Sequence, residues 1–452
     1  MFAFTGILLG LVSSIIMQTI LATVLPSVVE DLGGENLYSW VFSIYLISST
    51  ITIPIFAKLA DLYGRKRFYL GGMVIYLVGS ALNGIAQTMG QLVIYRVIQG
   101  LGAGALAPAA IAMISDLFPI KERGKMMGML ATTQVLANIL GPFLGGLVAD
   151  NFGWQWAFWA TLPSGILALI LVAVGFTDSP KEKPKINLSQ IDFIGGLLLG
   201  IAIVFFIQGF EMIKAQEFRY IQTGLIFLVA VFIFAIFIRQ ERHHPDPVVS
   251  SCLIATKNIK VCLMSTFLMG TVMYGAIVVL PLFGQALFGK TALQGGKLLI
   301  PLALGLGAGG IFSGKLTKKI SYANFVISGW LVVFLGFCLL ALFCTIQLSY
   351  YPLSAIVIII GFGLGVIFPT LLISGQNAVA ENQRAVVGGL VQMTRNLGGA
   401  VGIPLFTGFI TQFSNKMINA DENNSYLMLF ILLAIVSLVG VVIGSRFKGS
   451  FD

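Results

Sequence analysis

Several charged residues of this sequence stand beside long apolar stretches, where they could do ionic chemistry. The run AKLADLYGRKR, residues 57–67, places Asp61, Gly64 and Arg65 between two such stretches. Gly64 permits a tight turn, and Asp61 can cap a helix end. Arg65 can pair with a carboxylate, and Asp116, at the end of another apolar stretch, is the obvious partner. Such a pair could latch a gate, although a basic cluster also serves simply to orient helices in a membrane.

A second group of charges stands at the opposite ends of the apolar stretches. Glu30 and Asp31 follow the first stretch, Asp150 follows a later one, and Arg96 lies inside a third. A buried arginine costs about 2.5–3.5 kcal/mol on membrane-insertion scales, so Arg96 needs a partner. A carboxylate that is alternately wet and occluded beside an arginine can bind and release a proton. We therefore consider these four residues candidates for proton coupling, with Glu211 as the next; the alternative is a solvated rim of acids.

Motifs for enzymatic or metal chemistry are missing from the sequence. It contains no HExxH, no GxSxG and no GxxxxGK[ST] motif, and its four cysteines form no CxxC pair. We expect no catalytic residue, no metal and no cofactor. Any energy for transport would then come from the proton motive force.

Composition identifies the elements that must position these charges. Of 452 residues, 57% are hydrophobic and 10% are charged, whereas about a quarter of a soluble domain is charged. The apolar residues come in blocks of about 20, the length of a helix that crosses a bilayer. We predict an all-α polytopic membrane protein with fourteen spans, at residues 4–29, 38–60, 67–87, 90–116, 125–149, 157–176, 191–213, 218–239, 259–287, 292–314, 323–346, 352–377, 385–411 and 425–445.

The distribution of basic residues tests this span count. With a cytoplasmic N-terminus, 20 of the 27 Lys and Arg residues fall in cytoplasmic segments and five fall outside. This asymmetry agrees with the positive-inside rule. It explains the net charge of +9 without a nucleic-acid partner, and it places both termini in the cytoplasm.

Short matches at a shared spacing indicate an internal repeat. Lys58-Leu59 and Lys315-Leu316 are 257 residues apart, as are Leu140-Gly141 and Leu397-Gly398. We infer two six-span halves, residues 1–180 and 258–452, the latter with a short tail. Residues 181–257 form an inserted two-helix segment with cytoplasmic linkers. Duplicated halves are an architecture of secondary transporters, which bind substrate near the bilayer midplane.

Three of the segments resemble motifs of the major facilitator superfamily. Residues 57–67 resemble its motif A, residues 96–104 its motif B, and residues 141–146 its motif C, the antiporter motif. In motif C, the resemblance assigns the antiporter role to Gly141, Pro142, Gly145 and Gly146. We expect Pro142 to bend the helix and the glycines to pack it against a helix of the other half. The resemblance implies the major facilitator fold, here as 6+2+6 spans, and antiport.

Further stretches narrow the resemblance to the fourteen-span drug:H⁺ antiporters. They are residues 40–45, 154–163, 244–247 and 293–304. The resemblance implies proton-coupled export of small amphipathic or cationic drugs by alternating access, across a bacterial cytoplasmic membrane and by a monomer in the lipid bilayer. A lipid or fatty-acid exporter of the same fold is the alternative, and a non-transporting receptor or scaffold is the alternative of another class.

One departure from that subfamily concerns the first span. Its usual acid and asparagine are replaced here by Met17 and Ala22, which removes a favoured cation or proton site. Polar, aromatic and soft side chains on the lining helices remain as candidates for the substrate cavity. They are Met17, Gln18, Thr19, Tyr45, Gln134, Asn138, Tyr274, Gln285, Phe368, Asn377, Gln392, Arg395 and Asn396. Arg395 could bind water, backbone carbonyls or an anionic substrate group, and a structural role is equally open.

Overall fold

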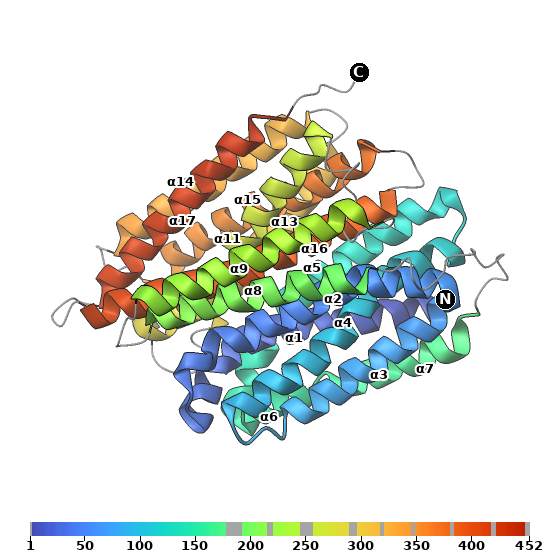
Figure 1. Cartoon of the computed structure of the whole chain (residues 1–452), viewed down its shortest axis with the longest axis horizontal. Helices are drawn as coiled ribbons and strands as arrows, with labels where there is room; N and C mark the ends of the chain where they lie inside the picture. The colour runs from blue at the N-terminus through green and yellow to red at the C-terminus, as the bar shows by residue number, and fades with distance from the viewer. Residues whose placement is uncertain are drawn as a thin grey trace. The chain divides into compact units, whose positions relative to one another are not determined.

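The computed structural model describes nine stretches of the chain: residues 2–177, 192–214, 220–244, 256–288, 296–316, 321–344, 349–379, 384–416 and 422–447. All regular secondary structure in these stretches is helical (Figure 1). The elements are α1 (Phe2–Leu32), η1 (Glu35–Leu37), α2 (Tyr38–Tyr63), α3 (Arg65–Asn83), α4 (Met89–Leu117), α5 (Ile120–Phe152), α6 (Trp154–Trp159), α7 (Leu162–Gly175), α8 (Phe193–Lys214), α9 (Tyr220–His243), α11 (Lys257–Phe288), α13 (Leu299–Leu316), α14 (Tyr322–Cys344), α15 (Tyr350–Asn377), α16 (Arg384–Lys416) and α17 (Glu422–Gly444).

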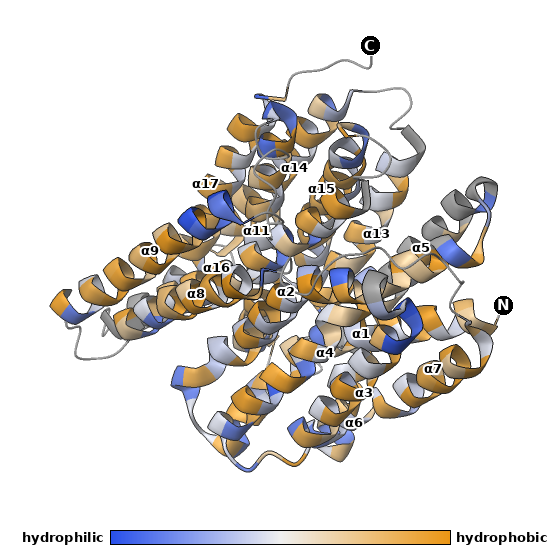
Figure 2. Cartoon of the chain, turned by 45° about the vertical axis from the view of Figure 1, so that its right-hand side comes forward, coloured by the Kyte–Doolittle hydropathy of each residue, from blue (hydrophilic) through white to orange (hydrophobic). Residues whose placement is uncertain are grey.

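The predicted spans coincide with these helices. Each predicted range overlaps one helix, except 157–176, which overlaps both α6 and α7. Ten helices in the described part of the chain are long and apolar enough to cross a membrane, and Leu299–Gly314 is a shorter apolar helix. Figure 2 shows the hydrophobic colour along most of the helices. The all-helical membrane architecture is confirmed, while the count of fourteen and the cytoplasmic termini stay predictions.

The chain divides into two compact units. Unit 1 comprises Met1–Phe205, Leu228–Val248 and Thr291–Leu293, and unit 2 comprises Phe206–Phe227, Val249–Lys290 and Gln294–Asp452. Helices α8 and α9 therefore contribute residues to both units. The predicted boundaries of the two halves and the insert, at residues 180 and 257, stay a prediction.

Close packing in unit 1 depends on glycines that face small side chains. Helix α1 packs on α5 and α7, and α4 packs on both α2 and α3. A Cβ atom on Gly100 would meet Ser48 and Tyr45 of α2, and one on Gly104 would meet Thr52 and Ser49. This confirms that the two glycines, four residues apart, permit close helix packing.

Unit 2 repeats the same pairing of helices. Helix α11 packs on α16, α13 on α15, and α14 on α15 and α17. A Cβ atom on Gly305 or Gly309 of α13 would meet the backbone of α15. The α11–α16 pair corresponds to α1–α5, and the α13–α15 pair corresponds to α2–α4. A duplication of the kind predicted from the sequence would produce this recurrence.

Candidate functional site

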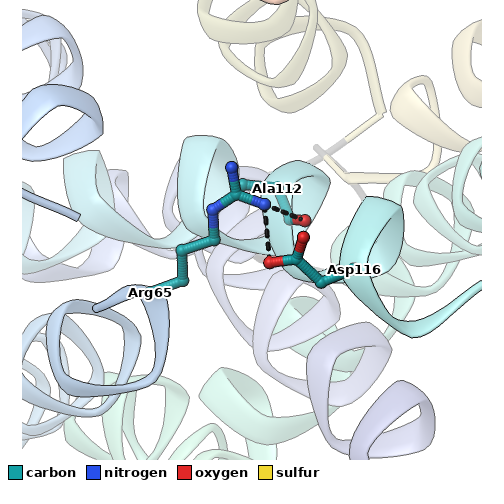
Figure 3. Close-up of polar contacts among 3 residues, drawn as sticks. All are labelled: Arg65, Ala112 and Asp116. Carbon is teal, nitrogen blue, oxygen red and sulfur yellow. Dashed lines mark hydrogen bonds and ion pairs between the residues drawn. The ribbon is translucent and has the colours of Figure 1, made fainter. Parts of the chain in front are cut away.

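An ion pair joins the start of α3 to the end of α4 in unit 1. The Nη1 atom of Arg65 lies 2.7 Å from Oδ2 of Asp116 and also donates to the carbonyl of Ala112 at 2.7 Å (Figure 3). The two charged side chains are 22% and 13% exposed, so water screens the pair only partly. The structure thus brings together the two residues that the sequence paired.

Gly64 supplies the turn that aims Arg65 at Asp116. It separates α2 from α3 with φ 108° and ψ 131°, a conformation that a side chain would strain. Its N–H donates to the carbonyl of Ala60 at 3.1 Å. Asp61, the other predicted gate residue, belongs to the last turn of α2, and its side chain lies outside the described residues.

Arg96 lies in the interior of unit 1 and is 1% exposed. Its Nε donates to the carbonyl of Val41 at 3.1 Å, and its Nη1 donates to Oε1 of Gln99. The guanidinium carbon lies 4.1 Å from the centre of the Tyr45 ring. Among the described residues, Arg96 therefore binds neutral groups and hydrogen-bonds none of the rim acids that the sequence suggested as partners.

The contacts of Arg96 belong to a larger network, which we call the unit-1 polar cluster: Ser14, Gln18, Tyr45, Asn83, Arg96 and Gln99. Nδ2 of Asn83 donates to Oε1 of Gln99 at 3.0 Å. The Tyr45 hydroxyl lies 3.1 Å from Ser14 Oγ, and Gln18 Nε2 donates to it at 3.5 Å. The sequence pointed to Gln18, Tyr45 and Arg96 but missed the other three, although each is a polar residue in an apolar stretch.

The predicted rim acids lie at helix ends and are exposed. Glu30 and Asp31 end α1, and Asp150 lies near the end of α5. Oδ2 of Asp31 accepts a hydrogen bond from the indole nitrogen of Trp154 at 2.8 Å, which ties α1 to α6. Glu211 is partly exposed on the portion of α8 that belongs to unit 2.

The antiporter-motif glycines face a helix of their own unit. A Cβ atom on Gly141 would lie 2.8 Å from Cβ of Thr19, and one on Gly145 would lie 3.0 Å from Cα of Ile20. Both contacts are with α1, so the expectation that these glycines pack against the other half is wrong. The reason is local: α1 approaches α5 so closely that only a residue without a side chain fits. Gly146 is also buried, while the side chain of Pro142 lies outside the described residues.

Unit 2 contains a second polar group, the unit-2 polar cluster: Tyr274, Phe368, Gln392, Arg395 and Asn396. Oδ1 of Asn396 accepts from the Tyr274 hydroxyl at 3.3 Å and from Nε2 of Gln392 at 3.4 Å. The guanidinium carbon of Arg395 lies 4.5 Å from the centre of the Phe368 ring. Its Nε is buried without a hydrogen-bond partner. These five predicted cavity residues, from α11, α15 and α16, thus form two contact groups that meet at the adjacent positions 395 and 396.

Other predicted cavity residues lie apart from the two clusters. Met17 is 0% exposed, and Thr19 donates to carbonyls of its own helix while it faces Gly141. Gln285 has a buried Nε2 without a hydrogen-bond partner. Asn377 is exposed at the end of α15, where it donates to the Tyr322 hydroxyl at 2.8 Å.

Asn377 is nine positions beyond Phe368, which corresponds to roughly 13 Å along a helix. It therefore lies outside the unit-2 polar cluster. The side chains of Gln134 and Asn138 lie outside the described residues.

The sequence reasoning passed over one buried carboxylate. Asp192 is 2% exposed and precedes α8. Its Oδ1 accepts from the backbone N–H of Gly195 at 2.7 Å, as a helix cap does, and from Gln240 of α9 at 3.4 Å. Its Oδ2 is buried with no hydrogen-bond partner in the described structure. The capping spacing of Asp192 and Gly195 was the available signal.

Comparisons with known proteins give a consistent result. Residues 7–403 match the family model described as Major Facilitator Superfamily. The chain is 34% identical to Multidrug resistance protein 3 of Bacillus subtilis (strain 168), with 93% of this chain and 81% of that protein aligned. It is 32% identical to Multidrug transporter protein MdtP of the same organism, with 92% and 76% aligned.

Solved structures share the fold at low sequence identity. An auto-inhibited POT family peptide transporter superposes with a TM-score of 0.70 at 12% identity, covering 99% of this chain and 97% of that one. A bacterial homologue of the human lysosomal transporter Spinster superposes with a TM-score of 0.67 at 15% identity, covering 100% and 98%. These likenesses concern the fold alone.

Proposed function

The chain belongs to the major facilitator superfamily of membrane transporters, which are not enzymes, and we propose that it is a proton-coupled antiporter that exports small amphipathic drugs, cations included. The observation that carries the proposal is the alignment of nearly the whole chain with two Bacillus subtilis proteins named for multidrug resistance and multidrug transport. The proposed location is the bacterial cytoplasmic membrane, with fourteen spans and both termini in the cytoplasm.

The chemistry of the two polar clusters supports a broad range of substrates. Each cluster combines an arginine with an aromatic ring, at Arg96 with Tyr45 and at Arg395 with Phe368. In unit 1, Gln18 bonds the Tyr45 hydroxyl, and in unit 2, Asn396, next to Arg395 in the chain, bonds Tyr274. Tyr45 is buried beside Arg96, so the groups that can meet a substrate are the partly exposed Gln18 and Gln392, whose amides adapt as donors or acceptors. Such surfaces accommodate several shapes of substrate.

Transport would use the proton gradient and no cofactor, and a monomer would suffice. Nothing in the relatives favours the alternative of a lipid or fatty-acid exporter, or that of a receptor. The acids that exchange the proton are proposed to be among Glu30, Asp31 and Asp150, which are exposed near helix ends.

A test of this function is drug accumulation in a bacterial strain without its own efflux pumps. We expect expression of the protein to lower the steady-state accumulation of a fluorescent cationic dye and to raise the inhibitory concentration of several unrelated drugs. A protonophore should abolish both effects, because export depends on inward proton flow. Export that survives the protonophore but stops when ATP is depleted would contradict the proposal.

A further inference from the structure

We propose that the unit-2 polar cluster is a subsite for an anionic group, such as a carboxylate, on an amphipathic substrate, with Arg395 as the residue that binds it. This inference rests on the proposed function and narrows its substrate class. It predicts that zwitterionic drugs are accepted, in addition to cations.

Arg395 lies deep within its helix. It lies 11 positions after the first residue of α16, which places it roughly 16 Å along the helix. The hydrocarbon core of a bilayer is about 30 Å thick, so this depth is near its middle. A guanidinium at this depth is costly without a partner, which makes an intramembrane arginine a functional candidate.

Arg395 has no ion-paired counter-charge in the part of the chain that the structure describes. From Lys257 to Lys416 the sequence contains a single acidic residue, Glu381, and it lies outside the described residues, before α16 begins. In the described structure, the guanidinium of Arg395 makes no hydrogen bond and no ion pair, and its Nε is buried unpaired. Among the described residues of unit 2, none gives Arg395 an ion pair that would compensate its positive charge.

Arg395 differs from Arg96 in the contacts that its guanidinium makes. Both arginines lie on an aromatic ring, at 4.1 Å over Tyr45 and at 4.5 Å over Phe368. Arg96 also donates to Val41 and Gln99 and is 1% exposed, so the protein already satisfies it. Arg395 has the ring alone and is partly exposed. Because Nε is buried, the donors that stay available to a ligand are the two Nη nitrogens.

The surroundings of Arg395 hold its guanidinium in place. The α16 backbone at Arg395 approaches α11 so closely that a Cβ atom on Gly270 would lie 3.0 Å from the Arg395 Cα. The next residue, Asn396, is held by Tyr274 and Gln392. Because one face of the guanidinium lies on Phe368, its edge is the part that can form two parallel bonds with a carboxylate.

Two dyes that differ only at a carboxylate can test the inference. Rhodamine B carries a free carboxylate on a cationic ring system, and its ethyl ester is the matching permanent cation. Binding of each dye to the purified full-length protein would be measured by fluorescence anisotropy, and export by efflux from loaded cells. We would compare the unaltered protein with Arg395→Gln and Arg395→Lys. Arg446→Gln, in the exposed turn after α17, makes the same chemical change away from the cluster.

We expect Arg395→Gln to weaken rhodamine B binding and export by about tenfold or more, as the loss of a charged hydrogen-bonded pair implies. The ester should change by less than about twofold, since it cannot form that pair. Arg395→Lys should show an intermediate loss for the acid alone, because it keeps the charge and loses the planar fork. Arg446→Gln should affect neither dye.

Equal losses of both dyes in Arg395→Gln, or no loss of either, would overturn the inference while leaving multidrug export intact. If both Arg395 variants fail to fold, the relative binding of the two dyes to the unaltered protein still tests the inference. Binding of the ester more than about tenfold tighter than binding of the acid would exclude an anion subsite of the expected strength. If neither the unaltered protein nor any variant exports either dye, the proposed function itself is wrong. The binding measurements then test the anion subsite separately.

Discussion

At the scale of the residue, the arginines of unit 1 show two ways to satisfy a guanidinium near or within a bilayer. Arg65, at a helix end, pairs with the carboxylate of Asp116 and the Ala112 carbonyl. Arg96, inside a helix, uses a carbonyl, an amide and an aromatic ring. The Arg65–Asp116 pair depends on opposite charges, so the two charges can be swapped between the helices. The contacts of Arg96 depend on the shape of its surroundings and cannot be swapped in this way.

The first prediction concerns the Arg65–Asp116 pair. We expect Arg65→Asp and Asp116→Arg each to slow drug export by about fivefold or more, the lower end of an allosteric coupling. The reason is that the ion pair fixes the helix ends on which a cytoplasmic gate would be built. The double variant should recover much of the rate, though not all of it, because an aspartate at position 65 cannot donate to Ala112.

The effect of swapping the charges at positions 65 and 116 would be measured as initial efflux rates, normalised to the amount of protein in the membrane. Asp61→Asn should also reduce export at nearly normal expression, as the charge pattern of residues 57–67 predicts. A double variant no better than either single one would indicate that the ion pair acts through something other than charge complementarity. Full export by Asp61→Asn would remove Asp61 from the gate.

The second prediction concerns the rim acids. Because Met17 stands where the resemblance would place an acid, we expect neutralisation of Asp150, with Glu30 or Asp31, to abolish proton-driven efflux and to spare drug binding. Proton movement induced by drug would be followed in proteoliposomes for Glu30→Gln, Asp31→Asn and Asp150→Asn. Normal coupling in all three would exclude the rim acids and direct attention to Glu211.

Asp31 needs a control of its own, because it also accepts a hydrogen bond from Trp154. Trp154→Phe removes that bond and leaves the carboxylate in place. If Asp31 carries a proton, only Asp31→Asn should impair coupling. Identical behaviour of the two variants would mean that Asp31 merely holds α1 to α6.

The partner of a charged side chain could be predicted from the sequence where both residues lie at the ends of helices. Arg65 and Asp116 could be paired because the start of α3 and the end of α4 are both predicted on the cytoplasmic side, and Gly64 forces the turn just before Arg65. The partners of Arg96 could not be found in this way, because a buried arginine can accept any polar neighbour. Val41 contributes only its carbonyl, and no sequence pattern marks a carbonyl that is left available.

At the scale of the element, the contact between α1 and α5 shows what glycine spacing reveals and what it leaves open. Gly141 and Gly145 are one helical turn apart, which indicates a surface for close packing. The spacing does not say which helix occupies that surface. The structure places Thr19 and Ile20 of α1 there, although α2, α3 and α4 separate α1 from α5 along the chain.

The third prediction tests this contact. Gly141→Ala should lower the stability of the protein by about 1–3 kcal/mol, the cost of overpacking, because the new methyl would lie 2.8 Å from Cβ of Thr19 and 3.2 Å from the carbonyl of Ile16. Adding Thr19→Ala, which removes the hydroxyl and methyl groups of Thr19, should restore part of the loss. The midpoint of thermal unfolding in detergent would report both changes.

Gly71 provides the matched control for that substitution. It lies within α3, where a Cβ atom would meet nothing within 4 Å. Gly71→Ala should therefore leave the midpoint unchanged or raise it slightly, since alanine favours a helix over glycine. An equal drop for Gly71→Ala and Gly141→Ala would show that the contact with α1 is not the cause.

At the scale of the whole molecule, the inserted helices decide how many times the chain crosses the membrane. The windows in Phe193–Ile213 and Ile221–His243 have mean hydropathies of 2.3 and 2.7. Only 17% of the α9 window is buried, and Leu225, Leu228 and Phe232 are among its exposed residues. A surface this apolar is stable against lipid and unstable against water, so both helices are expected to cross.

The last prediction follows from that crossing. In a variant whose four cysteines are replaced by serine, Gln216→Cys, between α8 and α9, should react with a membrane-impermeant maleimide in intact cells. Lys183→Cys, before α8, and Ser445→Cys, after α17, should react only when the membrane is permeabilised, because both are predicted to be cytoplasmic. Labelling would be quantified on purified protein, with permeabilised cells as the reference for each position.

Protection of Gln216→Cys in intact cells would mean that α8 and α9 do not cross, which would reduce the count of spans from fourteen to twelve. Labelling of Ser445→Cys from outside would instead reverse the orientation of the last span, and with it the assignment of the Arg65–Asp116 pair to the cytoplasmic side.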